Sequence, residues 1–126
     1  MRGASAIEQI LTERRDQPIR VLVVWEPVLP TDWLAPGTMA LARVADARAR
    51  QYWDWNRLLS KSMGEHDRRS IVWDHVAVYP PGVSWVASPP EPVYQGHPVV
   101  RVTGPLMQAL DQFTAPARAA IQTPRR

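Results

Sequence analysis

The chain contains no cysteine among its 126 residues. This absence excludes a disulfide framework, a cysteine-ligated zinc site and dithiol redox chemistry. No apolar run approaches the roughly 20 residues that a membrane-spanning helix needs. The first residues also lack the apolar stretch of a secretory signal. We therefore expect a cytoplasmic protein that has no membrane contact and requires no cofactor.

Lysine is scarce as well, since Lys61 is the one lysine among the 15 basic residues and the net charge is +3. The arginines are scattered among acidic residues, and no block of five like charges occurs, which argues against nucleic-acid binding. The preference for arginine could indicate recognition of phosphates or carboxylates by guanidinium groups. It could equally reflect a GC-rich coding sequence.

Hydrophobic periodicity and turn residues predict the regular segments. In chain order they are a helix over 5–15, a strand over 19–25, a proline-rich loop over 26–38, a helix over 46–63, a strand over 70–79, a hairpin over 92–102 and a helix from Thr103. This length suits one domain. We place its core at 19–113 and expect a flexible tail over 115–126.

This order predicts an α/β fold. Two strands that are joined by a helix form a right-handed parallel βαβ unit. Val21 and Val76 should then lie on neighbouring parallel strands. The terminal hairpin would complete one small mixed sheet with helices on both faces.

The succession resembles the thioredoxin family over roughly residues 19–113. A strand that ends at Trp25 leads into residues 29–32, where the family carries its Cys-x-x-Cys motif, and Pro92 is similar in spacing to the family's cis-proline. The resemblance implies a thioredoxin-like fold with Pro92 as the cis-proline. Both cysteines are missing, so it implies no redox activity. The loop after Trp25 is longer than the family pattern, and the segment 80–90 replaces a helix.

Two acids follow the first predicted strand. Glu26 and Asp32 could form a carboxylate pair whose split pKa values divide acid and base work, with Tyr79 and Pro92 nearby. Alternatively, Asp32 is a turn or capping residue. Thr31 would need an activating base to act as a nucleophile, and no base is spaced recognisably near it.

The three histidines are His66, His75 and His97. They could converge with Asp67 or Asp74 on a metal, but no metal-binding motif is present, so we expect no metal site. Asp74 and His75 lie in a predicted interior strand, where polar groups need partners. His75 therefore either makes a structural hydrogen bond or belongs to a polar cluster that faces a cleft.

Tryptophan is over-represented, with six residues against one phenylalanine. Trp25 and Trp73 lie in predicted strands and are expected in the core. Trp53 and Trp55 are two apart on a predicted helix, about 200° around its axis, so one of them should face solvent or a partner.

Trp33 and Trp85 lie in proline-rich loops that could meet in an exposed aromatic patch. The leading hypothesis is a non-catalytic binding or protein-interaction module that uses Trp33, Trp85 and either Trp53 or Trp55. Its partner would be another protein or a second copy of the chain. The alternative is a small-ligand-binding protein or an enzyme with a carboxylate site at the strand ends.

Overall fold

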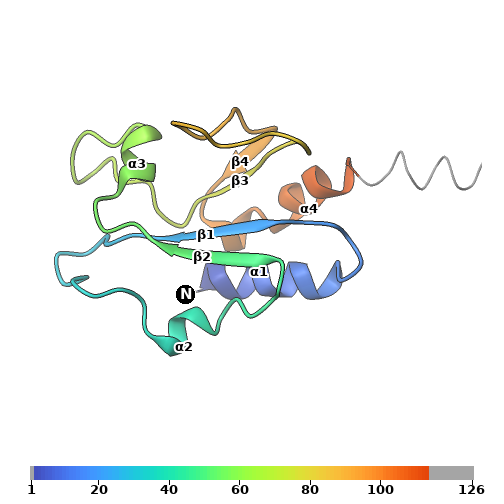
Figure 1. The fold of residues 1–126 in the computed structure, drawn as a ribbon, viewed down its shortest axis with the longest axis horizontal. Helices are drawn as coiled ribbons and strands as arrows, with labels where there is room; N and C mark the ends of the chain where they lie inside the picture. The colour runs from blue at the N-terminus through green and yellow to red at the C-terminus, as the bar shows by residue number, and fades with distance from the viewer. Residues whose placement is uncertain (1, 114–126) are drawn as a thin grey trace, which may run out of the picture.

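The computed structural model describes residues 2–113, so the tail expected over 115–126 lies outside the described residues. Figure 1 shows the arrangement of its helices and strands. In chain order these are α1 (Arg2–Glu13), β1 (Val21–Trp25), α2 (Thr38–Leu41), β2 (Ala49–Trp53), α3 (Leu58–Ser62), β3 (Val76–Val78), β4 (Tyr94–Gly96), the 3₁₀ helix η1 (Val99–Arg101) and α4 (Thr103–Asp111).

The strands form a parallel pair and an antiparallel hairpin. β1 pairs with β2 in parallel, with Val21 opposite Ala49 and Trp25 opposite Trp53. β3 pairs with β4 in antiparallel orientation. The prediction of a small mixed α/β protein is confirmed at the level of a parallel pair of strands, an antiparallel hairpin and helices.

The strand that completes the parallel unit is not the one that the sequence predicted. Val21 pairs with Ala49, whereas Val76 pairs with Gly96 in the other sheet. The prediction that Val21 and Val76 lie on neighbouring parallel strands is therefore wrong. Within residues 2–113 the two pairs of strands form separate sheets.

The long helix predicted over 46–63 is also wrong, because its first half is the strand β2. Side chains of β2 alternate between half-buried and exposed, and this period of two is typical of a strand. The apolar repeat from Tyr52 onward indicated a helix only because aromatic residues continue past the end of the strand. Only α3 remains helical, and Gly64, with φ of 115°, follows it at the predicted end.

The predicted strand over 70–79 shrinks to β3. Asp74 has a left-handed φ of 49°, which interrupts an extended backbone two residues before the strand begins.

The hairpin that we predicted over 92–102 is wrong in its second half, where η1 replaces a strand. Pro98 has no N–H to donate to a sheet and begins this turn instead. The cis peptide bond in the described chain precedes Pro98, which corrects the expectation that Pro92 is the cis-proline.

The core lies where α1, the hairpin and α4 meet. Ile10, Val78, Leu106 and Ala109 are buried together there. Because α1 supplies part of this core, the core extends beyond the predicted limits of 19–113. None of the helices within residues 2–113 has the length and apolar character that a bilayer crossing needs.

Arg48 fastens the start of β2 to the end of α1. Its guanidinium donates hydrogen bonds to the carbonyls of Leu11, Arg14 and Gln17 over 2.7–2.8 Å. A cation suits this position because the last carbonyls of a helix lack partners and carry partial negative charge. The Arg48 side chain also pairs with Asp46 at 2.8 Å, and its hydrogen bonds hold the pKa of Asp46 down at about 2.

Candidate functional site

The carboxyl ends of β1 and β2 carry an acidic pair. Glu26 directly follows β1, and Asp54 directly follows β2. The two strands are parallel neighbours, so their carboxyl ends meet at one edge, which is where open α/β folds place their sites. Figure 1 shows α3 beside this edge, at the points of the two arrows.

Amide groups at the start of α3 bind this acidic pair. The N–H of Ser60 donates to Oε1 of Glu26 at 3.1 Å, and the N–H of Leu59 donates to Oδ2 of Asp54 at 2.9 Å. Burial raises the pKa of Glu26 to about 7; the Ser60 amide opposes this rise, and the carboxylates of Asp54 and Glu65 add to it. The pair can therefore hold a proton near neutral pH.

Glu65 lies beside the pair, and its carboxylate contributes to the raised pKa of Glu26. Its side chain is 5% exposed, its Oε1 accepts a hydrogen bond from Nε of Arg57 at 2.9 Å, and its Oε2 has no partner among residues 2–113. Arg57 also donates to the carbonyl of Pro27 at 3.4 Å, which links the loop after β1 to the segment after β2.

Asp32 belongs to the loop and not to this acidic pair. Its Oδ2 accepts hydrogen bonds from the N–H groups of Val28 at 3.0 Å and Leu29 at 2.7 Å. This is the capping role that the sequence analysis gave as the alternative. Glu26 has its carboxylate partner in Asp54 and not in Asp32. No three histidine, aspartate or glutamate side chains in the described part of the chain are arranged to hold a metal ion.

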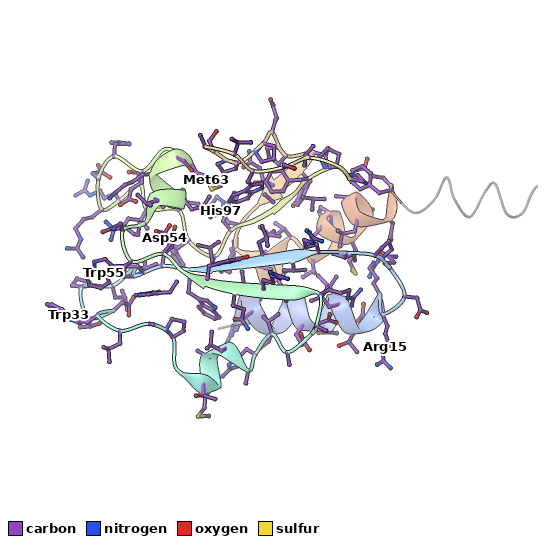
Figure 2. The ribbon with its side chains drawn as sticks, viewed as in Figure 1. Arg15, Trp33, Asp54, Trp55, Met63 and His97 are labelled. Carbon is purple, nitrogen blue, oxygen red and sulfur yellow. The ribbon has the colours of Figure 1, made fainter. Side chains whose placement is uncertain are left out.

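A surface hollow of about 240 Å³ opens next to the acidic pair. We call it the tryptophan hollow, and its walls come from the loop after β1 and the segments after β2 and α3. The residues that matter below are Pro27, Pro30, Trp33, Trp55 and Arg68. Trp33 is 71% exposed and Trp55 is 51% exposed. Figure 2 shows both tryptophans at the same end of the molecule as Asp54.

The remaining tryptophans of the predicted interaction surface lie differently. Trp53 is half-buried, with its ring 6.2 Å from that of Trp55, so it supports the exposed ring. Trp85 packs edge-on against Tyr79 at 5.7 Å and does not line the hollow. Trp73 is 62% exposed, so the expectation that it lies in the core is wrong.

Trp25 is half-buried, and its indole N–H donates to Oε1 of Gln51 at 2.8 Å.

The pairing of Trp33 with Trp55 is one of the two alternatives that the sequence left open, whereas Asp54 was not predicted as a site residue. A signal was present: the dipeptides Trp25-Glu26 and Trp53-Asp54 both place an acid directly after a tryptophan. In the structure these tryptophans are paired in register at the last position of both strands. The signal was hidden because the second dipeptide lay inside the predicted helix.

The histidines separate into one surface residue and one pair. His66 lies exposed at the surface, close to Asp67 at 3.8 Å. His75 and His97 face each other at 6.2 Å between ring centroids, beside a cleft that is distinct from the tryptophan hollow.

No family model, no curated protein and no solved structure matches this chain.

Proposed function

We propose that this protein is a non-catalytic binding module whose tryptophan hollow takes an acidic and apolar segment of a partner protein. The observation that carries the proposal is that Trp33 and Trp55, from separate segments, line one hollow while most of Trp33 and half of Trp55 stay exposed. Exposed apolar surface of this kind is typical of protein-interaction sites.

The two indole rings can supply most of the binding free energy. Covering them would remove roughly 200–300 Å² of surface from water, because a fully buried aromatic side chain accounts for about 150–250 Å². At about 25 cal/mol per Å² this amounts to about 5–7 kcal/mol before the costs of association. Tryptophan and arginine are also the residues most enriched among binding hot spots.

The hollow is held in shape before a partner arrives. Asp32 caps the loop that carries Trp33, and Arg57 bonds that loop at Pro27. The contact between Glu26 and Asp54 holds the loop after β1 against the segment after β2, and both of these segments contribute walls of the hollow. Preorganisation of this kind favours affinity because less conformational entropy is lost on binding.

The charge of the hollow favours an acidic partner segment. Arg68 lines it and forms no ion pair with any residue in the described range. The acid that lines the hollow, Asp32, already binds two backbone amides. An incoming carboxylate would therefore meet an available guanidinium and little repulsion.

An enzyme or small-ligand site at the strand ends is the alternative. The pKa of Glu26 near 7 would suit a general acid or base. However, Glu26 and Asp54 line neither the tryptophan hollow nor the larger cleft, and both bind the amides of α3. We therefore infer that this pair holds the ends of β1 and β2 to the start of α3. The thioredoxin-like assignment is a separate hypothesis, and the binding proposal does not depend on it.

A peptide selection tests the proposal. Random peptides displayed on phage would be selected on the wild-type protein and counter-selected on Trp33→Ala. We expect enriched peptides that combine Asp or Glu with Leu, Phe or Trp, and an affinity loss of at least tenfold for Trp33→Ala and Trp55→Ala. The matched control is Trp73→Ala, because Trp73 is similarly exposed but lies outside the hollow.

Two further readouts complete this test. Trp85→Ala should bind normally, since Trp85 does not line the hollow. Sedimentation of the unliganded protein tests whether the partner is a second copy of the chain. In that case the wild-type protein forms a dimer, and the Trp33→Ala variant is a monomer. Peptides whose affinity is the same for wild type, Trp33→Ala and Trp55→Ala would contradict the proposal.

A further inference from the structure

A second and larger depression lies between the end of α3 and the hairpin. Its volume is about 880 Å³, within the range of about 300–1,000 Å³ that is usual for small-molecule sites. We call it the histidine cleft, after His75 and His97 in its wall. Met63, which follows α3, and His97 both line the cleft and are labelled in Figure 2.

The two imidazoles form a stacked pair, with centroids 6.2 Å apart and ring planes 30° from parallel. His75 is half-buried, and its Nε2 has no hydrogen-bond partner among residues 2–113. Burial lowers the pKa of His75; a hydrogen bond with Gln95 opposes this effect, and the proximity of His97 adds to it. The lowered pKa favours the neutral form of the His75 ring, and a negative charge placed beside the ring would favour its protonated form.

The charged and titratable side chains that face the cleft favour an anion. They are Arg69, Asp74, His75, Tyr79 and His97. Asp74 accepts a hydrogen bond from the N–H of Val99 at 3.4 Å, and burial raises the pKa of Tyr79, which keeps its hydroxyl neutral. Three of these five groups are cations or can become cations.

The rest of the wall is apolar and suits a flat molecule. Trp73, Ile71 and the prolines of the segment 89–92 line it beside the polar groups. A few polar groups set in an apolar wall are what orient a small ligand. An aromatic ring can lie against these apolar side chains while its acid group reaches the histidines.

We propose that the histidine cleft binds a small aromatic carboxylate, with its carboxylate between Arg69 and the pair of His75 and His97. Ile71 lines both this site and the tryptophan hollow, but the groups that would bind the carboxylate line the histidine cleft alone, so the proposal can fail or succeed independently of the proposed function. Binding should tighten as the pH falls, because a protonated imidazole attracts the carboxylate and a neutral one does not.

Titration of the histidine ring protons by NMR tests the site, with benzoate as the probe and benzamide as its uncharged counterpart. Benzoate should shift the resonances of His75 and His97, and its affinity should rise at least threefold between pH 7.5 and pH 5.5. His66 is an internal control because its side chain is 78% exposed and lies outside the cleft. Benzamide should shift none of the three.

Two neighbouring arginines provide a matched pair of variants. Arg69 lines the histidine cleft, whereas Arg68 lines the tryptophan hollow, and both are exposed. Arg69→Gln should weaken benzoate binding at least threefold, and Arg68→Gln should leave it unchanged. The proposal is overturned if benzoate shifts no histidine, shifts all three equally, or binds Arg69→Gln as it binds wild type.

Discussion

Replacing Glu26 by glutamine should make the protein more stable in mildly alkaline solution. Glu26 is held between β1 and α3, and burial raises its pKa from 4.5 to about 7. Glutamine keeps an oxygen that can accept the hydrogen bond from Ser60, but it cannot ionise. The substitution therefore removes the charge without removing the contact.

The sign follows from the linkage between proton binding and folding. A carboxyl group whose pKa is raised by folding binds protons more tightly in the folded state, so its stabilisation is greatest at low pH. Glu26 then loses this stabilisation as the pH rises from about 4.5 to about 7. Without solvent screening, this loss in the free energy of unfolding would be about 3 kcal/mol. Because Glu26 is only half-buried, solvent screening reduces it to about 1–2 kcal/mol.

Urea denaturation between pH 4.5 and pH 8.5 measures this effect. Glu26→Gln should unfold with a free energy that exceeds the wild-type value by about 1–2 kcal/mol at pH 8 and converges with it near pH 4.5. Glu91→Gln is the control, because Glu91 is exposed in the loop before β4. A constant difference between wild type and Glu26→Gln at all pH values would refute the reasoning.

Three further substitutions test the parts of the fold that position the site. Arg48→Met should lower the free energy of unfolding by about 1–3 kcal/mol in urea, since the carbonyls of Leu11, Arg14 and Gln17 each lose one hydrogen bond. A change below the error of the measurement would contradict the role of Arg48 in holding β2 to the end of α1. Leu106→Ala should cost about 2–5 kcal/mol, because the side chain is 3% exposed in the core, and an unchanged midpoint of thermal unfolding would place the core elsewhere. The lowered pKa of Asp46, about 2, predicts that wild type loses stability as the pH falls from about 4 to about 2, and Asp46→Asn should lack this acid-induced loss in a circular dichroism titration.

The sequence predicts those elements whose local pattern and tertiary environment agree. The run of β-branched residues before Trp25 forms β1, and the segment from Thr103 forms α4 where expected. The segment 49–53 was predicted wrongly because it carries aromatic residues that suit either a helix or a strand. Pairing with β1 decides its conformation, and a partner strand distant in the chain is invisible to local periodicity.

The same reason limited the prediction of the site. Glu26 and Trp33 were recognised as candidates because they lie in the loop after an evident strand. Trp55 was named as an alternative to Trp53 on a predicted helix, whereas Asp54 could be found only once β2 was known to run beside β1. Trp85 was paired with Trp33 because both lie among prolines, whereas the structure packs Trp85 against Tyr79.

The most direct test of the binding module follows the six indole N–H resonances by NMR while a selected acidic peptide is added. The resonances of Trp33 and Trp55 should shift and saturate together, and that of Trp53 should follow them weakly through its contact with Trp55. Those of Trp73 and Trp85 should remain in place. Saturable shifts confined to Trp73 or Trp85, with Trp33 and Trp55 unmoved, would contradict the account.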